Sequence, residues 1–372
     1  MKTDTILERV NGVLAGINYP AEPKGLYEPV DYVLGLGGKR LRPVLMLLVY
    51  SLYKPDYELI MPAAVAIEMY HNYTLLHDDL MDHADLRRGK PTVHKVWDNN
   101  TAILSGDVML VLACRGLLSL QNPKTNEAME LFLRTATEVA EGQQMDMNFE
   151  KRDDVTEAEY IAMIRLKTAV LVAAAARMGA LLGGAAERDC DKLQSFGERV
   201  GLAFQLQDDL LDAYGNTSVF GKRTGGDILQ NKRTWLFINA YAKAGVPERN
   251  ELDRWFSSSE SSGSSSESSG SSSAPSVSSS VSSLSSPAAL GLLSGCKGSL
   301  QAPAEEHAAS LEEEKIAAVM RVYDKLGVKE SCQRAIDSYF QEARNLLDEV
   351  NISDEAKGEL WAFASSLCGR VV

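Results

Sequence analysis

The sequence predicts an all-α protein, and two observations support this. Apolar residues recur at helical spacing through most of residues 1–256. Alternating runs of β-branched residues joined by hairpin turns, which would indicate sheets, are missing from the sequence. The chain has 372 residues, of which 45% are hydrophobic and 24% charged, so it can bury a sizeable core.

The expected helices follow one another along the chain. A basic, glycine-rich turn precedes the first strongly apolar helix, and small residues interrupt the second. Thr156 is a suitable N-cap for the fourth helix, because Glu159 follows three residues later and can complete a capping box. The ranges with helical spacing are 41–53, 61–82, 131–148, 157–182 and 191–212.

A serine-rich segment divides the helical pattern. Residues 257–310 hold too few apolar side chains to offset the entropy of ordering, so we expect a disordered insertion in an interhelical loop. Residues 1–256 form the predicted catalytic helical domain. The pattern resumes at 311–372, which is short for an independent core. These last helices are therefore expected to dock on the same domain.

Charge and cysteine content exclude several classes of function. The formal net charge of −13 disfavours nucleic acid as a partner. The five cysteines are odd in number and form no CxxC pair, which is typical of a reduced, cytoplasmic protein. No stretch approaches ~18 uninterrupted apolar residues, so no membrane span is expected.

Two copies of one acidic pattern are the main chemical signal. Asp-Asp-x-x-Asp occurs at 78–82 and again at 208–212, each time inside an apolar, helix-favouring stretch. Positions i and i+4 share a helix face, so each cluster places two carboxylates side by side. Such carboxylates repel each other unless a cation lies between them, and oxygen ligands suit Mg²⁺. A solvated charged face explains one such cluster, but two matching clusters favour metal binding.

Basic residues gather near both acidic clusters. The glycine-rich turn at 37–43 carries three cations within four positions, and an Arg-Arg-Gly sequence follows the first cluster. Further basic elements are at 167–168 and 221–232. Taken singly, each could be an ordinary basic turn or helix end. Together, in an acidic protein, they predict a polyanionic ligand bound with metal.

Histidines near the first cluster suggest an alternative, a metal phosphohydrolase with His and Asp ligands. However, no HExxH or HxxxH spacing occurs, and the second acidic cluster has no place in that scheme. We therefore interpret His71 as a hydrogen-bond donor to diphosphate and His77 as structural.

These motifs together resemble the trans-isoprenyl diphosphate synthases, the polyprenyl synthetase family. The resemblance rests on both DDxxD motifs, GGKRxRP, the Arg-Arg-Gly sequence, Phe204-Gln205 and GKxxGxD, in family order. It covers nearly the whole chain outside the serine-rich segment. It implies an isoprenoid synthase fold, a helical bundle around a central cavity, and a homodimer.

The resemblance also implies roles for individual residues. About three Mg²⁺ ions would be bound between the two motifs. Ala169, where the family often has glycine, is a small departure. The implied metal ligands are Asp78, Asp82 and Asp208, supported by Asp79, Asp209 and Asp212, with Lys167 and Lys222 stabilising the leaving group. Isopentenyl diphosphate would contact Lys39, Arg42, His71 and Arg88, and the allylic diphosphate Arg87, Lys167, Thr168, Gln205, Lys222 and Lys232.

The implied activity is condensation of isopentenyl diphosphate with an allylic diphosphate (dimethylallyl, geranyl or farnesyl) by ionisation, condensation and elimination. Tyr73 lies five positions before Asp78, beside the small Thr74, and could form the floor of the product pocket. An aromatic residue there implies a short C15–C20 product, farnesyl or geranylgeranyl diphosphate. The alternatives are a longer-chain synthase, a terpene cyclase, a head-to-head synthase and a non-catalytic synthase subunit.

Overall fold

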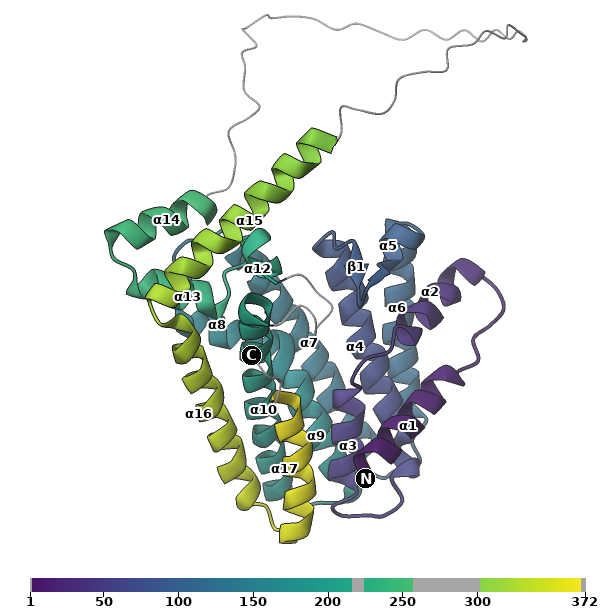
Figure 1. The fold of residues 1–372 in the computed structure, drawn as a ribbon. Coiled ribbons are helices and arrows are strands. Elements are labelled where there is room, and N and C mark those ends of the chain that lie inside the picture. The colour runs from purple at the N-terminus through teal and green to yellow at the C-terminus, as the bar shows by residue number, and fades with distance from the viewer. Residues whose placement is uncertain (1, 216–223, 257–301, 369–372) are drawn as a thin grey trace, which may run out of the picture.

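The computed structural model describes residues 2–215, 224–256 and 302–368, and confirms the all-α class (Figure 1). Long helices run roughly parallel or antiparallel to one another. In the first half of the chain they are α1 Lys2–Ala15, α2 Lys24–Gly35, α3 Leu41–Tyr50, η1 Tyr57–Ile60, α4 Met61–Met81, α5 Val93–Val96, α6 Asn99–Leu118 and α7 Thr125–Phe149.

The second half supplies the other wall of the bundle. The C-terminal helix α16 packs along α10, and α17 packs against α3 and α10. The elements are α8 Glu157–Ile164, η2 Arg165–Ala169, α9 Val170–Gly183, α10 Glu187–Tyr214, α12 Gly226–Leu229, α13 Trp235–Lys243, α14 Val246–Phe256, α15 Ala302–Lys325, α16 Val328–Asp348 and α17 Asp354–Cys368.

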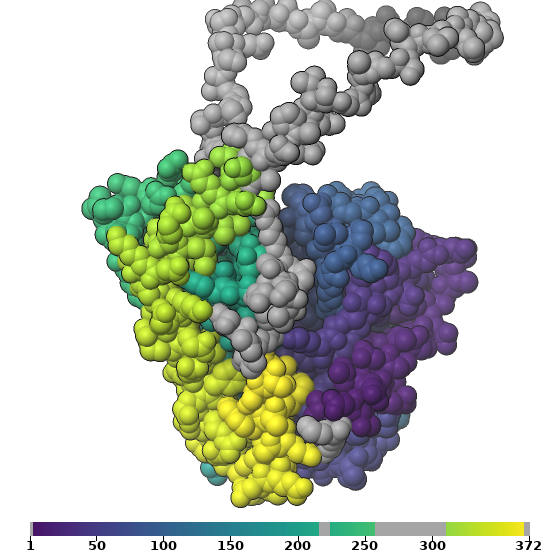
Figure 2. Space-filling view, in the orientation of Figure 1, coloured from purple at the N-terminus to yellow at the C-terminus, as the bar shows by residue number. Residues whose placement is uncertain are grey.

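Two apolar cores hold the helices together. The larger core joins α1, α3, α4, α6 and α9, and the second lies around the C-terminal half of α10 with α8, α13, α15 and α16. In the space-filling view, the α4–α5 region and the α12–α15 region stand as two sides of one end of the molecule (Figure 2). The two acidic motifs belong to these two sides, on α4 and α10.

The expected start of the fourth helix is confirmed. Thr156 Oγ1 accepts from the Glu159 backbone N–H at 3.3 Å, and Glu159 Oε2 accepts from the Thr156 N–H at 2.9 Å. Such reciprocal capping satisfies two backbone donors that the helix itself cannot.

A π-helical turn, η2, interrupts the long helix that runs from α8 into α9. A Cβ atom on Gly142 of α7 would lie 2.2 Å from the Lys167 backbone nitrogen, and one on Gly201 of α10 would lie 2.7 Å from Ala169 Cα. Glycine at both positions therefore allows two neighbouring backbones to clamp the turn from opposite helices. This clamp fixes the direction of Lys167 and Thr168, which the turn carries.

The structure shows a hairpin that the sequence did not predict, and it differs from the sequence prediction at the start of the C-terminal helices. The Arg-Arg-Gly sequence lies in a minimal hairpin, β1 Leu86–Arg87 and β2 Lys90–Pro91, because Arg88 and Gly89 both adopt the positive φ of a tight hairpin turn. Helix α15 begins at Ala302, whereas the helical pattern was expected to resume at Leu311. The alanine- and glutamate-rich sequence there favours a helix despite its few apolar residues. The rest of the predicted insertion, 257–301, lies outside the described residues.

Two helical stretches are long and apolar enough to cross a membrane by length and composition alone. Glu157–Gly183 has 78% of its most apolar window buried inside the protein, as a core helix does, whereas Asn99–Leu118 has 33% buried. The expectation of no membrane span therefore stays a prediction.

Candidate active site

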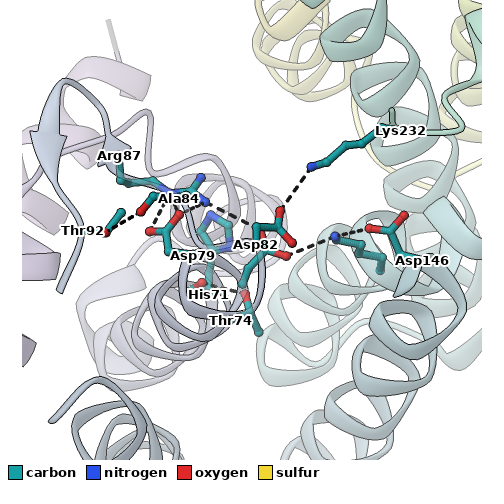
Figure 3. A network of polar contacts seen from close by, with 11 residues as sticks. His71, Thr74, Asp79, Asp82, Ala84, Arg87, Thr92, Asp146 and Lys232 are labelled. Atoms are coloured by element: carbon teal, nitrogen blue, oxygen red, sulfur yellow. Dashed lines mark hydrogen bonds and ion pairs between the residues drawn. The ribbon is translucent and has the colours of Figure 1, made fainter. Parts of the chain in front are cut away.

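The first acidic motif lies at the C-terminal end of α4. Lys167 Nζ donates to Asp78 Oδ1 at 3.2 Å, and Lys232 Nζ donates to Asp82 Oδ2 at 3.2 Å (Figure 3). Both lysines come from the opposite side of the bundle. The first and last carboxylates of the motif therefore face the second half of the protein and pair with cations there.

Asp79, the middle carboxylate, points elsewhere. It is buried, and the Arg87 guanidinium holds it through Nη2 at 2.6 Å from Oδ1 and through Nε at 2.9 and 3.0 Å from the two oxygens. Burial raises the pKa of Asp79, and Arg87 opposes that shift. The hairpin thus brings Arg87 back onto α4, where its Nη2 also lies 3.6 Å from Asp78 Oδ2.

The second motif, near the end of α10, repeats this arrangement. Asp209 is buried and accepts from the Tyr160 hydroxyl at 2.5 Å and from Gln205 Nε2 at 3.1 Å, while Thr168 Oγ1 donates to Gln205 Oε1 at 3.0 Å. Burial, with a smaller contribution from Asp227, raises the pKa of Asp209 to about 8. In both motifs, then, the middle aspartate is directed inward and anchors a neighbouring element.

The outer aspartates of the second motif have different surroundings. Asp212 Oδ2 accepts from the Asp227 backbone N–H at 3.0 Å, and so caps the start of the short helix α12. Asp208 is half-buried, and its charge acts on Arg42 of α3. Lys222 lies outside the described residues.

Sequence reasoning missed Asp146 of α7. Its Oδ2 lies 2.6 Å from Lys167 Nζ, so Lys167 bridges Asp146 and Asp78 (Figure 3). Burial by itself would lower the pKa of Lys167, but the two carboxylates raise it above its ordinary value. Tyr160 was missed as well. In the sequence, the signal for Asp146 is an acidic residue one helical turn after Gly142. A lone Asp on a helix is too common a feature to identify a site.

A separate basic site lies beside the first motif. Arg42 is half-buried, its buried Nε has no hydrogen-bond partner within the described protein, and burial lowers its pKa to about 10. Burial, reinforced by Arg42 and Arg88, lowers the pKa of His71 well below its usual range, so His71 is neutral. A guanidinium with an orphaned buried donor is suited to an anionic ligand.

The glycine-rich turn shapes this site. Arg88 Nη1 donates to the Gly37 carbonyl oxygen, and a Cβ atom on Gly38 would lie 2.7 Å from the Arg88 guanidinium. Gly37 and Gly38 both have positive φ. Glycine therefore lets the turn approach Arg88 closely, and the exposed Lys39 follows directly.

The carboxylates fit a hard divalent cation. Among the described residues no three His, Cys, Asp or Glu side chains form a compact metal cluster. Instead Asp78 and Asp82 form ion pairs with Lys167 and Lys232, so the oxygens of both carboxylates already have cations as partners. Oxygen donors from two opposite helices, together with phosphate oxygens of a bound diphosphate, would suit Mg²⁺.

Tyr73 packs beneath the first motif. Its ring centroid lies 4.7 Å from that of His77, edge to face, and 5.5 Å from that of Tyr70. Thr74 Oγ1 donates to the His71 carbonyl oxygen at 2.7 Å. The Tyr73 ring thus packs between those of Tyr70 and His77 on α4.

Comparison with known proteins agrees with this geometry. The polyprenyl synthetase family profile matches residues 23–268. The geranylgeranyl diphosphate synthase of Methanosarcina mazei is 43% identical over 59% of this chain and 69% of its own length. The short chain isoprenyl diphosphate synthase of Methanocaldococcus jannaschii is 41% identical over 66% and 75%.

Solved structures confirm the isoprenoid synthase fold. A geranylgeranyl pyrophosphate synthase crystal structure superposes with a TM-score of 0.80 at 39% identity, covering 100% of this chain and 98% of that one. The geranylgeranyl pyrophosphate synthetase of Pyrococcus horikoshii superposes with a TM-score of 0.81 at 26% identity and the same coverage. The chain therefore belongs to the polyprenyl synthetase family and is a short-chain trans-prenyltransferase.

Proposed function

We propose that this enzyme condenses isopentenyl diphosphate with an allylic diphosphate in a Mg²⁺-dependent reaction, giving geranylgeranyl diphosphate. The observation that carries the proposal is the arrangement of two anion-binding regions side by side. Asp78 and Asp82 pair with Lys167 and Lys232, and the charges of Asp208 and Arg88 act on Arg42 of the basic site. One region suits a diphosphate bound with metal, and the other a diphosphate bound by cations alone.

In the proposed mechanism, the C–O bond of the allylic substrate breaks, and negative charge accumulates on the diphosphate that leaves. Bound Mg²⁺, held by Asp78, Asp82 and Asp208, would neutralise part of that charge. Lys167 and Lys232 are placed to hold the diphosphate oxygens, and Thr168 is held in place by Gln205. The inward-facing Asp79 and Asp209 position these groups.

The second substrate would bind at the basic site. Arg42 and Arg88, with Lys39, provide the cations, and the neutral His71 provides a hydrogen-bond donor without adding charge. The isopentenyl double bond then attacks the allylic cation in a dry, apolar space, which limits capture by water. A released diphosphate oxygen takes the proton, since none of the described side chains stands out as a general base.

A C20 product is supported by the position of Tyr73. Its ring packs against His77, the residue before the first motif, and an elongating chain would extend along α4 in this region. Several relatives, including that of Methanosarcina mazei, are geranylgeranyl diphosphate synthases. An aromatic floor at this depth is consistent with a product of that length.

A homodimer is supported by the surface of α6. Leu104, Val111 and Leu118 are 58%, 55% and 57% exposed and recur at seven-residue intervals, so they form one apolar stripe on the helix. Leu133, on the adjoining α7, is 45% exposed. Asp107 and Arg115, also exposed, lie between these residues, and an apolar row of this kind is typical of a surface that a second copy covers. We also place the enzyme in the cytoplasm, in keeping with the unpaired state of Cys114, Cys190 and Cys332, the cysteines that the structure describes with their side chains.

Product analysis with purified protein tests the proposal. The protein is incubated with isopentenyl diphosphate, Mg²⁺ and each allylic primer in turn, and the dephosphorylated products are separated by chromatography. We expect a linear C20 alcohol. Cyclic hydrocarbons would indicate a terpene cyclase, a longer linear product would correct the chain length, and no product from the protein alone would favour a non-catalytic subunit.

A further inference from the structure

Arg40 lies in the same basic turn as Lys39 and Arg42, yet its side chain points into the protein. The guanidinium group is 3% exposed and uses three nitrogens on three partners. Nη1 donates to Glu68 Oε1 on α4 at 2.7 Å, Nη2 to the Leu34 carbonyl oxygen on α2 at 2.6 Å, and Nε to Asn11 Oδ1 on α1 at 3.1 Å. One side chain therefore fixes the turn to three helices.

The backbone of the turn needs such support. Arg40 has a φ of 47°, in the left-handed region that a residue with a Cβ atom adopts only at a cost. Gly37 and Gly38, just before it, also have positive φ, and α3 begins directly after it. A turn in this conformation keeps its shape only when surrounding contacts determine it.

The partner of Arg40 belongs to the opposite wall of the basic site. Glu68 is 2% exposed, and Asn72 Nδ2 donates to its Oε1 at 3.0 Å. Glu68 precedes His71 by three residues on α4, which places both on one face of the helix. The ion pair therefore holds the turn that carries Lys39 and the start of α3 with Arg42 against the helix face that carries His71.

Stability alone does not account for a buried ion pair here. Desolvation of two charges cancels much of their attraction, so apolar side chains of similar size often serve stability equally well. The three hydrogen bonds of the planar Arg40 guanidinium fix the orientation of the turn, which apolar packing alone does not do.

We propose that Arg40 is a positioning residue for the isopentenyl diphosphate site. It sets the spacing of Lys39 and Arg42 relative to His71 and touches neither substrate itself. This inference rests on the proposed function, in which these three residues bind that diphosphate. Arg40 contacts none of the residues assigned to the allylic site, which lie on η2, on α10, after α12, in the hairpin and at the C-terminal end of α4.

The test measures the KM for isopentenyl diphosphate and the KM for the allylic substrate in Arg40→Lys. This variant keeps the positive charge but cannot make the three hydrogen bonds of the guanidinium. We expect the KM for isopentenyl diphosphate to rise about tenfold, while the KM for the allylic substrate stays within about twofold. Arg177→Met is the matched control, because Arg177 pairs with Glu187 and Asp191 far along α9 and α10 from the motifs. It should leave both constants unchanged.

The thermal unfolding midpoint is recorded for each variant. Equal changes in both Michaelis constants, or an unchanged KM for isopentenyl diphosphate in a folded Arg40→Lys protein, would overturn the inference. Where Arg40→Lys does not fold, Asn11→Ala removes one acceptor of the fork at an exposed residue and should still raise that KM alone, about twofold to threefold. An unaltered value in this variant also overturns the inference.

Arg42→Gln separates this inference from the proposed function. It should raise the KM for isopentenyl diphosphate whether or not Arg40 has a positioning role. A normal KM in Arg42→Gln means that the assigned site is wrong. A raised KM in Arg42→Gln with a normal KM in Arg40→Lys means that only the positioning role is wrong.

Discussion

Lys167 Nζ lies 2.6 Å from Asp146 Oδ2, and the same ammonium group lies 3.2 Å from Asp78 Oδ1. Lys167 therefore joins α7 to the end of α4 through the π-helical turn that carries it. A lysine placed between two carboxylates stays charged and oriented even though it is mostly enclosed. An ammonium group held in this way can bind a departing diphosphate without a change in the position of its side chain.

The Asp146→Asn variant tests that arrangement. Loss of the carboxylate charge weakens the orientation of Lys167, so we expect kcat to fall by about tenfold to a hundredfold, as for other residues that orient a ligand-binding group. The KM for isopentenyl diphosphate should change little. Steady-state kinetics with both substrates measures this. Glu141→Gln, at an exposed position of the same helix, is the control, and equal effects in both variants would contradict the role of Asp146.

Gly142→Ala should be strongly destabilising and should weaken allylic binding. The new Cβ atom would lie 2.2 Å from the Lys167 backbone nitrogen, so α7 or the π-helical turn must move. A shift of the turn misplaces both Lys167 and Thr168. Gly116→Ala, also inside a helix, places its Cβ atom at ordinary contact distances of 3.5 Å and is the matched control. Thermal unfolding and the allylic KM report the two effects; if Gly142→Ala behaves like the control, the turn is not clamped.

Tyr73→Ala should lengthen the product. Removing the ring that packs against His77 and Tyr70 opens the space below the first motif, so the growing chain can extend past C20. Chromatography of the dephosphorylated products measures the length. Tyr73→Phe keeps the ring and should leave the product unchanged. Products of equal length from both variants would place the floor of the pocket elsewhere.

The sequence predicted the fold class and many of the acidic and basic side chains that the structure brings together, because both depend on repeated, local patterns. Helical spacing gave the long helices, and the spacing of Asp78 and Asp82 on one face follows from helix geometry alone. It could not show that Asp79 and Asp209 turn inward, since their partners Arg87 and Tyr160 are defined by a hairpin and by the packing of α8 on α10.

The Tyr160→Phe variant tests the inward position of Asp209. The change removes one hydroxyl group and leaves a buried carboxyl oxygen without its donor at 2.5 Å. We expect a loss of about 1–3 kcal/mol in the free energy of unfolding, the usual cost of an unsatisfied buried polar group. Denaturant titration measures it. Tyr27→Phe, at a partly exposed tyrosine on α2, is the control and should cost much less.

Val111→Glu should convert the proposed homodimer to monomers. The carboxylate would stand in the middle of the Leu104, Val111 and Leu118 stripe, where burial against a second copy would leave two like charges unpaired. Light scattering after size-exclusion chromatography gives the mass in solution. Val246→Glu, at a residue on α14 that is 73% exposed and outside the stripe, should leave the dimer intact. A Val111→Glu protein that elutes with the unaltered dimer mass would exclude this face of α6 as the interface.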